Sequence, residues 1–150
     1  AGLGAYSLPL AKKVGPSGKV YAVDVQKDLL ARLAKEASHQ RLNNLEVVWG
    51  DVERPGGSKL PDKAVDLVLL SNLLFQSQAQ YSILKEAKRI LKPNGRLVII
   101  DWKDSFGGLG PAAGAVIKPA EVEKILKELG LKILKNFEAG EHHYGLVATL

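Results

Sequence analysis

Acidic and polar side chains lie at or just after the carboxyl ends of the predicted strands. Asp24 ends one β-branched run, Asp51 follows another after Gly50, and Ser71 and Asn72 end a third. At the carboxyl ends of parallel strands, one carboxylate can accept hydrogen bonds from ribose hydroxyls and another can receive an exocyclic amine. This spacing predicts nucleoside binding. The alternatives are that Asp24 or Asn72 caps a helix and that Gly50-Asp51 forms a plain turn.

The chain opens with AGLGAYS, in which Gly2 and Gly4 precede a helical pattern. Glycines let a ligand approach the backbone closely, and the first amides of a helix can face an anion. Two spaced glycines often occur by chance. Asp24, about 20 residues later, adds the spacing that nucleoside-binding turns show.

Asp101, His142 and His143 are candidates to accept a proton, because they lie near the ends of predicted strands. Adjacent strand residues point to opposite faces, so one histidine must face away from any site, and both are also explained as polar hairpin residues. A metal site built from Glu141, these histidines and the distant His39 is disfavoured, since adjacent ligands on a strand diverge. We expect no metal.

The elements that position these residues alternate between strand and helix. Near-continuous Val, Ile and Leu predict buried parallel strands at 19–24, 44–51, 64–72 and 95–102, and helical spacing predicts helices at 7–14, 27–38 and 80–91. A helix starting at Pro119 and closing at Gly130 follows, and 131–140 and 141–150 predict an antiparallel hairpin. The fold class is therefore α/β: a Rossmann-like three-layer sandwich, mostly parallel, with a closing hairpin.

Composition sets wide limits on function. The 150 residues are 46% hydrophobic, which suits one domain over 1–150, and the absence of cysteine excludes disulfides, thiolate zinc sites and Cys nucleophiles. There is no long apolar run and no signal-peptide pattern, so we expect a cytoplasmic protein without a membrane partner. The net charge is +5, but the lysines alternate with glutamates along helices, which disfavours a nucleic-acid surface.

The motifs together resemble those of class I S-adenosylmethionine-dependent methyltransferases of the small-molecule branch. AGLGAYS is similar to the tail of the glycine-rich first motif, VYAVDVQ to the second, VVWGDVE to the third and VDLVLLSNLLFQ to the fourth. The most specific stretch is EAKRILKPNGRLVIIDW, which is similar to the helix, turn and following strand of that branch. GLKILKNFEAGEHHYGLVATL resembles the family's closing hairpin.

The resemblance implies a cofactor, a reaction and residues for each. The cofactor is S-adenosylmethionine, and the reaction is methyl transfer to a small-molecule acceptor. The implied cofactor-binding residues are Gly2, Gly4, Asp24, Val25, Asp51, Val52 and Ser71. By their position near strand ends, the catalytic candidates for this reaction are Asn72, which would orient the acceptor, and Asp101 and His143, which are candidate bases. The glycine-rich loop 106–115 is interpreted as a lid over the acceptor or as a passive connector.

The sequence departs from the family pattern at its start, because the acid and first glycine of the first motif and the whole first strand are absent. The segments 19–24 and 64–70 would then each keep an unpaired edge. The edges could close on each other, belong to a longer natural protein, or be covered by a partner chain, which favours a homodimer. A second hypothesis is therefore an inactive or repurposed module that dimerises through these edges. A nicotinamide-dependent oxidoreductase is disfavoured, since no substrate domain follows.

Overall fold

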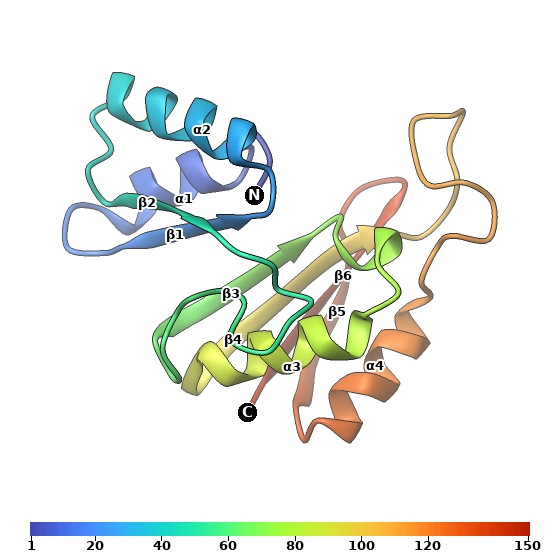
Figure 1. Ribbon diagram of the computed structural model, residues 1–150. Helices are drawn as coiled ribbons and strands as arrows, with labels where there is room; N and C mark the ends of the chain where they lie inside the picture. Colours follow the sequence, from blue (N-terminus) through green and yellow to red (C-terminus); the bar gives the residue numbers. More distant parts are fainter. The chain divides into compact units, whose positions relative to one another are not determined.

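The protein, described over residues 1–150 by a computed structural model, forms two compact units (Figure 1). The amino-terminal unit comprises Ala1–Val52 and Gly56–Lys59, and the carboxy-terminal unit comprises Glu53–Pro55 and Leu60–Leu150. Each unit has its own sheet. The prediction of a single domain over 1–150 stays a prediction.

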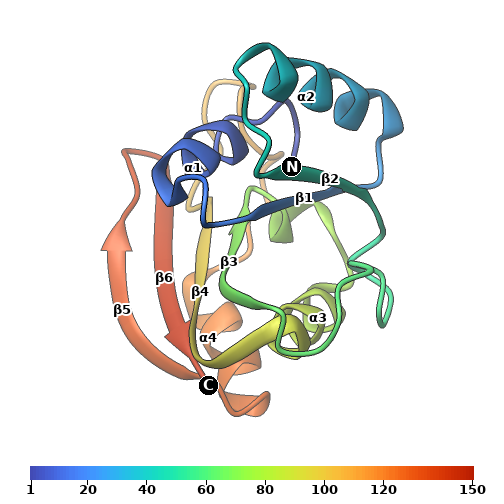
Figure 2. The same ribbon diagram turned by 90° about the vertical axis from the view of Figure 1, so that its left-hand side faces the viewer.

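The amino-terminal unit is a two-stranded parallel sheet with two helices. Its strands pair in register, from Val20 opposite Leu45 to Asp24 opposite Trp49. Figures 1 and 2 show both helices over the same face of the sheet. The elements in chain order are α1 (Ser7–Val14), β1 (Val20–Asp24), α2 (Lys27–His39) and β2 (Leu45–Trp49).

Apolar side chains at helical spacing bury α2 against this sheet. Leu30, Leu33 and Ala37 are 5%, 1% and 4% exposed and share one face of the helix, so their burial holds α2 in place. The side chain of Asn44 fastens the other helix, because its Nδ2 donates to the carbonyls of Ala11 (2.7 Å) and Gly15 (2.8 Å) at the end of α1. These carbonyls are among those that a helix end leaves without intrahelical partners.

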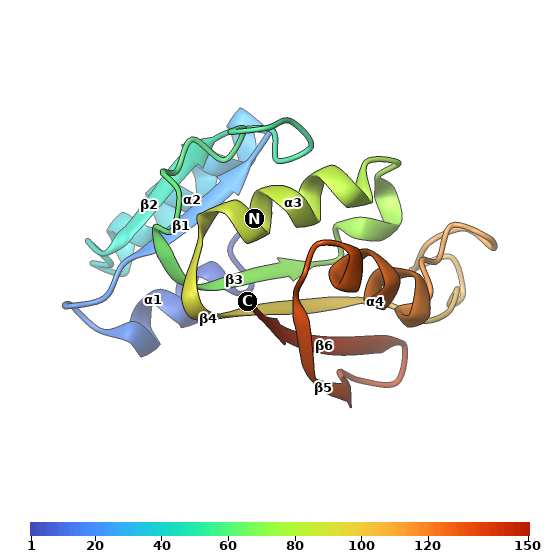
Figure 3. The same ribbon diagram turned by 90° about the horizontal axis from the view of Figure 1, so that it is seen from below.

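The carboxy-terminal unit is a four-stranded sheet in the order β3-β4-β6-β5. β3 and β4 are parallel, whereas β6 runs antiparallel to both β4 and β5. Figures 1 and 3 show α3 and α4 on one face of this sheet. The elements are β3 (Val65–Ser71), the 3₁₀ turn η1 (Leu74–Gln76), α3 (Gln80–Ile90), β4 (Leu91–Trp102), α4 (Pro119–Glu128), β5 (Lys132–Glu138) and β6 (His143–Thr149).

The core of this unit lies between the sheet and its two helices. The spacing that predicted the helix at 80–91 places its apolar residues inward, and the inward positions of β4 and β6 alternate with outward ones. The core side chains that are at most 4% exposed include Ile83, Leu84, Ala87, Leu97, Ile99, Val122, Leu126, Leu146 and Ala148.

The turn expected after α3 lies inside a strand. We expected Pro93-Asn94-Gly95 to separate the helix from a strand beginning at residue 95, but β4 begins at Leu91, directly after α3. Leu91 pairs with Val65, and the ladder then jumps to Arg96 opposite Leu67, so the turn loops out of an otherwise continuous strand. Asn94 has a φ of 63°, as a tight turn requires.

The predicted α/β class with a closing antiparallel hairpin is confirmed by these two sheets. The expected edges are present as well: β1 is paired only with β2, and β3 only with β4. None of the helices combines the length and the apolar character that crossing a membrane requires.

Candidate functional site

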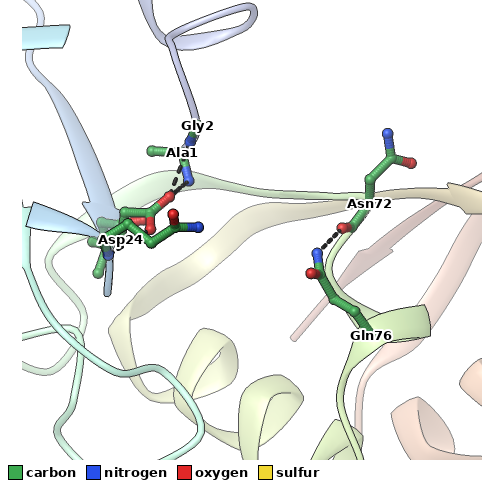
Figure 4. Close-up of polar contacts among 7 residues, drawn as sticks. Ala1, Gly2, Asp24, Asn72 and Gln76 are labelled. Atoms are coloured by element: carbon green, nitrogen blue, oxygen red, sulfur yellow. Dashed lines mark hydrogen bonds and ion pairs between the residues drawn. The ribbon is translucent and has the colours of Figure 1, made fainter. Parts of the chain in front are cut away.

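Asp24 lies at the carboxyl end of β1, and its carboxylate is fixed by donors on both sides (Figure 4). Its Oδ2 accepts the amide of Gly2 (3.0 Å) and the amino group of Ala1 (2.7 Å), and its Oδ1 accepts the amide of Gln26 (2.9 Å). Gln26 is itself the N-cap of α2, and that helix has no side-chain cap. The alternative that Asp24 caps the helix is therefore not what its contacts show.

The surroundings of Asp24 favour its ionised form. Burial alone would raise the pKa of this carboxyl, but the hydrogen bonds from the amino group of Ala1 and from the amides of Gln26 and Gly2 outweigh burial, and the pKa is lowered. Asp24 is thus a carboxylate at neutral pH. In that form it only accepts hydrogen bonds, which suits a partner that carries hydroxyl groups.

The two glycines of the opening turn have different surroundings. Gly2 has a φ of +55°, and a Cβ built on it would meet no atom within 4 Å, so its backbone faces open space. Gly4 has a φ of +93°, and a Cβ there would lie 2.5 Å from Leu33 and 3.0 Å from Leu8. Gly4 is therefore required by packing against the helices, whereas Gly2 leaves room for a ligand.

An apolar surface lies beside Asp24. Val25 and Trp49 are 55% and 58% exposed, and the indole Nε1 of Trp49 donates to the carbonyl of Val25 (3.1 Å). The Nζ of Lys27 lies 4.3 Å from the centre of the indole ring. Trp49 was not among the predicted site residues. Its sequence signal is that it ends the strand that precedes Gly50-Asp51.

The segment after β2 lies at the carboxyl end of the two-stranded sheet, as Asp24 does. The amide of Gly50 donates to the carbonyl of Asp24 (3.1 Å), which continues the parallel pairing by one residue. Asp51 and Val52 follow at once and are both half-buried. The structure therefore brings together five of the predicted cofactor residues, namely Gly2, Asp24, Val25, Asp51 and Val52.

In the carboxy-terminal unit, Ser71 ends β3 and Asn72 begins the turn that follows. Asn72 has a φ of 50°, its amide donates to the carbonyl of Ile100 (2.9 Å), and its carbonyl accepts the Nε2 of Gln76 (2.6 Å; Figure 4). Its side-chain Oδ1 is buried and has no hydrogen-bond partner. Asn72 caps no helix, because the N-cap of η1 is Leu73 and that turn has no side-chain cap.

Asp101 is a buried carboxylate near the end of β4, only 1% exposed. Its Oδ2 accepts the amide of Leu74 (2.9 Å), its Oδ1 accepts the amide of Trp102 (2.8 Å), and the neighbouring amides of Leu73 and Phe75 also favour its charged form. Burial raises its pKa, and these four amides only partly oppose that rise.

The two adjacent histidines of the hairpin have different environments. The Nδ1 of His142 lies 2.8 Å from the Oδ1 of Asp104, and its ring stacks on Phe106 with the ring centres 4.0 Å apart. The ring of His143 lies 4.1 Å from that of Trp102, and its Nε2 is buried without a partner. Of the two, His143 is the one with a buried ring nitrogen that makes no hydrogen bond within the protein.

The tyrosine beside His143 carries a second buried group without a partner. Tyr144 is 5% exposed and pairs with Asp101 across β4 and β6. Burial, and then the negative charges of Asp101 and Glu121, raise the pKa of its phenol, and its hydroxyl has no hydrogen-bond partner. Sequence reasoning missed Tyr144, since an alternating apolar strand gives no sign of which polar atom lacks a partner.

The glycine-rich loop packs on the same end of the sheet. Phe106 stacks on His142, and Gly110 lies so close to the indole of Trp102 that a Cβ there would be 3.1 Å from the ring. The loop is thus attached to the hairpin end. These contacts are compatible with a lid and with a connector. No group of three or more His, Asp or Glu side chains is placed to hold a metal ion.

A family model described as "Methyltransferase domain" matches residues 1–141 of the chain. Among solved structures, a SAM-dependent methyltransferase from Aquifex aeolicus is 33% identical, with a TM-score of 0.87 over 98% of this chain and 77% of that one. The PH0226 protein from Pyrococcus horikoshii is similar in fold, with a TM-score of 0.79 at 19% identity over 99% of this chain and 77% of that one. The predicted Rossmann-like α/β fold is confirmed by these likenesses.

Curated relatives carry the name demethylmenaquinone methyltransferase. The protein from a Geobacillus strain is 29% identical over 96 residues, which cover 64% of this chain and 40% of the relative. The protein from Oceanobacillus iheyensis is 30% identical over 102 residues, covering 67% and 41%. The chain thus spans less than half the length of these relatives.

Proposed function

Because the chain belongs to the methyltransferase-domain family, we propose that it transfers a methyl group from S-adenosylmethionine to a small-molecule acceptor. The observation that carries this proposal is Asp24, an ionised carboxylate held at the carboxyl end of a parallel strand beside exposed Val25. That is where α/β sheets bind nucleosides.

The residues of the amino-terminal unit suit the nucleoside part of S-adenosylmethionine. In this proposal the carboxylate of Asp24 accepts hydrogen bonds from the ribose hydroxyls, and the open backbone at Gly2 lets the ligand approach. Val25 and Val52 offer apolar contact to the adenine ring, and Asp51 receives its exocyclic amine. Gly4 supports the turn through its packing and need not touch the ligand.

The carboxy-terminal unit supplies candidates for the chemical step. S-adenosylmethionine supplies a sulfonium-bound methyl group, which is transferred by in-line displacement, so positioning provides most of the catalysis. We assign orientation to Ser71 and Asn72, since the buried Oδ1 of Asn72 has no internal partner. We assign acceptance of the proton to His143, whose buried Nε2 is equally without a partner.

The acceptor that we propose is a quinone-type ring compound in its reduced, hydroxyl-bearing form, which is electron-rich enough to displace the sulfonium and has a proton to give to His143. Two observations support this class: the curated relatives are named for demethylmenaquinone, and the rings of Trp102 and His143 lie together at the end of the hairpin. Flat aromatic side chains bind flat rings well, because stacked rings add attraction beyond the area that they bury.

Calorimetric titration with S-adenosylhomocysteine, the demethylated product, tests the cofactor assignment. The wild-type protein should bind it, and Asp24→Asn should bind about 10- to 100-fold more weakly, since hydrogen bonds to a charged group contribute about 1.5 to 3 kcal/mol. Asp28→Asn is the matched control, because Asp28 is an exposed carboxylate in the first turn of α2. Equal affinity of Asp24→Asn and the wild type would reject the ribose contact.

A second candidate function is an assembly module, and the edges of β1 and β3 favour it. Each of these strands has a single partner, and Leu67 on β3 is 44% exposed. An unpaired edge is a template for a strand of another copy, so this candidate is a homodimer. Light scattering over a range of concentrations tests it: Leu67→Lys should dissociate the dimer, and Leu134→Lys on β5 should not. A wild-type protein that is monomeric at every concentration would rule the module out.

A further inference from the structure

The structure assigns to Asp101 the role of a positioning residue, which fixes the turn after β3 and thereby the placement of Asn72. Its catalytic consequence rests on the proposed function, but the role itself rests on hydrogen bonds within the carboxy-terminal unit. Sequence reasoning placed Asp101 among the candidate bases, and the contacts of its carboxylate favour this different task.

An amide of the turn binds this one side chain. The amide of Leu74 donates to Oδ2 of Asp101 (2.9 Å) and the amide of Trp102 to Oδ1 (2.8 Å), and the neighbouring amides of Leu73 and Phe75 also favour the charged carboxylate. Successive backbone amides that point into one concavity bind an anion, and here the anion is a side chain of the neighbouring strand. The conformation of the turn is therefore fixed by a side chain of β4.

Asn72 is held by the same neighbouring strand. Its amide donates to the carbonyl of Ile100, the residue before Asp101, so two successive residues of β4 hold Asn72 and Leu74 of the turn. The left-handed backbone of Asn72, with a φ of 50°, is uncommon for a residue other than glycine and persists where the surroundings impose it. Its buried Oδ1 is thus kept at a fixed place without a partner of its own.

A carboxylate is the side chain that this arrangement requires. It presents two acceptor oxygens and no donor, which matches the amides of Leu74 and Trp102, one on each oxygen. An asparagine in its place would keep one oxygen and turn an NH₂ group toward other N–H groups. Asp101→Asn is therefore a change of hydrogen-bonding capacity at nearly constant volume.

The same contacts argue against Asp101 as the base. A general base must come within hydrogen-bond reach of the proton that it takes. Asp101 is 1% exposed, and each of its oxygens already accepts a backbone amide. A residue so enclosed acts on the reaction through the turn that it holds.

Amide hydrogen exchange by NMR tests the role without reference to activity. Asp101→Asn should raise the exchange rate of the Leu74 amide at least about tenfold and leave the amides of α3 unchanged, as expected for loss of a local hydrogen bond. Glu86→Gln is the matched control, since Glu86 is a carboxylate 3% exposed that pairs with Arg89 instead of the turn. Unchanged turn amides in a folded Asp101→Asn would overturn the proposal.

If Asp101→Asn does not fold, a measurement on the wild type can still test whether the carboxylate of Asp101 binds the turn. A scalar coupling across the hydrogen bond should connect the Leu74 amide nitrogen to the side-chain carboxyl carbon of Asp101. Its absence, with couplings seen in the β3–β4 ladder of the same sample, would overturn the proposal.

Kinetics separates positioning from proton transfer. For methyl transfer we expect Asp101→Asn to lower kcat about tenfold or more with unchanged affinity for S-adenosylhomocysteine and an unchanged pH profile, and to add little to the loss caused by Asn72→Ala. Loss of a limb of the pH profile would instead make Asp101 the base and overturn the positioning role. A wild type without cofactor binding would defeat the proposed function alone, because the exchange and coupling measurements would still decide the role of Asp101.

Discussion

At the scale of single residues, two aspartates with similar partners have opposite acid–base behaviour. Asp24 and Asp101 each lie at or near the carboxyl end of a strand and each accept backbone amides, yet the pKa of Asp24 is lowered and that of Asp101 is raised. The difference lies in burial, since the side chain of Asp24 is 13% exposed whereas Asp101 is 1% exposed. Acceptor contacts alone therefore do not decide which carboxylate meets a ligand.

The lowered pKa of Asp24 predicts how stability depends on pH. A carboxyl whose pKa is lowered by folding stabilises the protein above its unfolded value of 3.8, and that contribution disappears as the pH falls through the lower folded value. Asp24→Asn should therefore cost about 1 to 2 kcal/mol at pH 7, and the gap to the wild type should narrow below about pH 4. Urea unfolding at both pH values measures it, and a gap that widens in acid would contradict the assignment.

The raised pKa of Asp101 predicts the opposite dependence of stability on pH. A carboxyl whose folded pKa lies above 3.8 lowers stability as the pH rises from 3.8 through its folded value, because the folded state holds the proton more tightly than the unfolded state. Asp101→Asn should flatten this fall in the free energy of unfolding as the pH rises. Glu86→Gln, which replaces another buried carboxylate, is the matched comparison. An unaltered slope in Asp101→Asn would show that Asp101 does not titrate in that range.

Tyr144 gives a prediction of a different kind, since its buried hydroxyl has no partner. Removing an unpartnered buried polar group relieves a desolvation cost, so Tyr144→Phe should leave the free energy of unfolding unchanged or raise it by up to about 1 kcal/mol. Tyr81→Phe, at a side chain 47% exposed, is the control. A loss of more than about 1 kcal/mol in Tyr144→Phe alone would mean that the hydroxyl makes a stabilising bond.

At the scale of elements, the sequence predicted which segments form strands and helices because local pattern determines these choices. The helix at 7–14 and the closing hairpin match the observed elements, and the predicted strands differ mostly at their ends. The predicted start of β4 at residue 95 was wrong, because the strand begins where Leu91 pairs with Val65, and these residues are distant in the sequence.

For the site, the sequence placed Asp24 and Asp51 after neighbouring strands, since both motifs are local. It could not foresee that Trp49 is exposed beside Val25, or that Asp101 is enclosed by the turn after β3. Exposure and hydrogen-bond partners are set by strands that meet only in the folded chain. Sequence therefore locates carboxylates at strand ends but does not show how exposed each one is or which groups donate to it.

The hairpin depends on one glycine. In β6, Gly145 pairs with Phe137 of β5, and the ring of Phe137 occupies the space where a Cβ of residue 145 would be. Gly145→Ala should therefore lower the free energy of unfolding by about 1 to 3 kcal/mol, as overpacking does. In a Phe137→Leu background, Gly145→Ala should lower the free energy of unfolding by less, because the ring is no longer there. Thermal unfolding of the four proteins measures this coupling, and equal losses in both backgrounds would show that the ring is not the cause.

At the scale of the whole molecule, each unit has its own sheet, its own buried core and one of the two tryptophans. Trp49 belongs to the amino-terminal unit and Trp102 to the carboxy-terminal unit. The amino-terminal unit is the smaller, and a small domain buries a smaller fraction of its surface on folding. The two units are therefore expected to differ in stability.

Urea unfolding followed by fluorescence tests this expectation. In Trp102→Phe the remaining Trp49 reports on the amino-terminal unit, and in Trp49→Phe the remaining Trp102 reports on the carboxy-terminal unit. We expect Trp49 to change at a lower urea concentration than Trp102, because separate cores can lose structure separately. Circular dichroism of both variants controls for the substitutions, and coincident transitions would show one cooperative structure.

The attachment of the glycine-rich loop bears on how such a protein can diverge. Lys103, Asp104 and Phe106 all contact His142, so the loop is fastened at its start, and α4 fixes its other end at Pro119. The cost of closing a loop rises only with the logarithm of its length. Insertions or exchanges between these two anchors are thus tolerated by the sheet, and natural selection can alter what binds at this end while the scaffold is inherited unchanged.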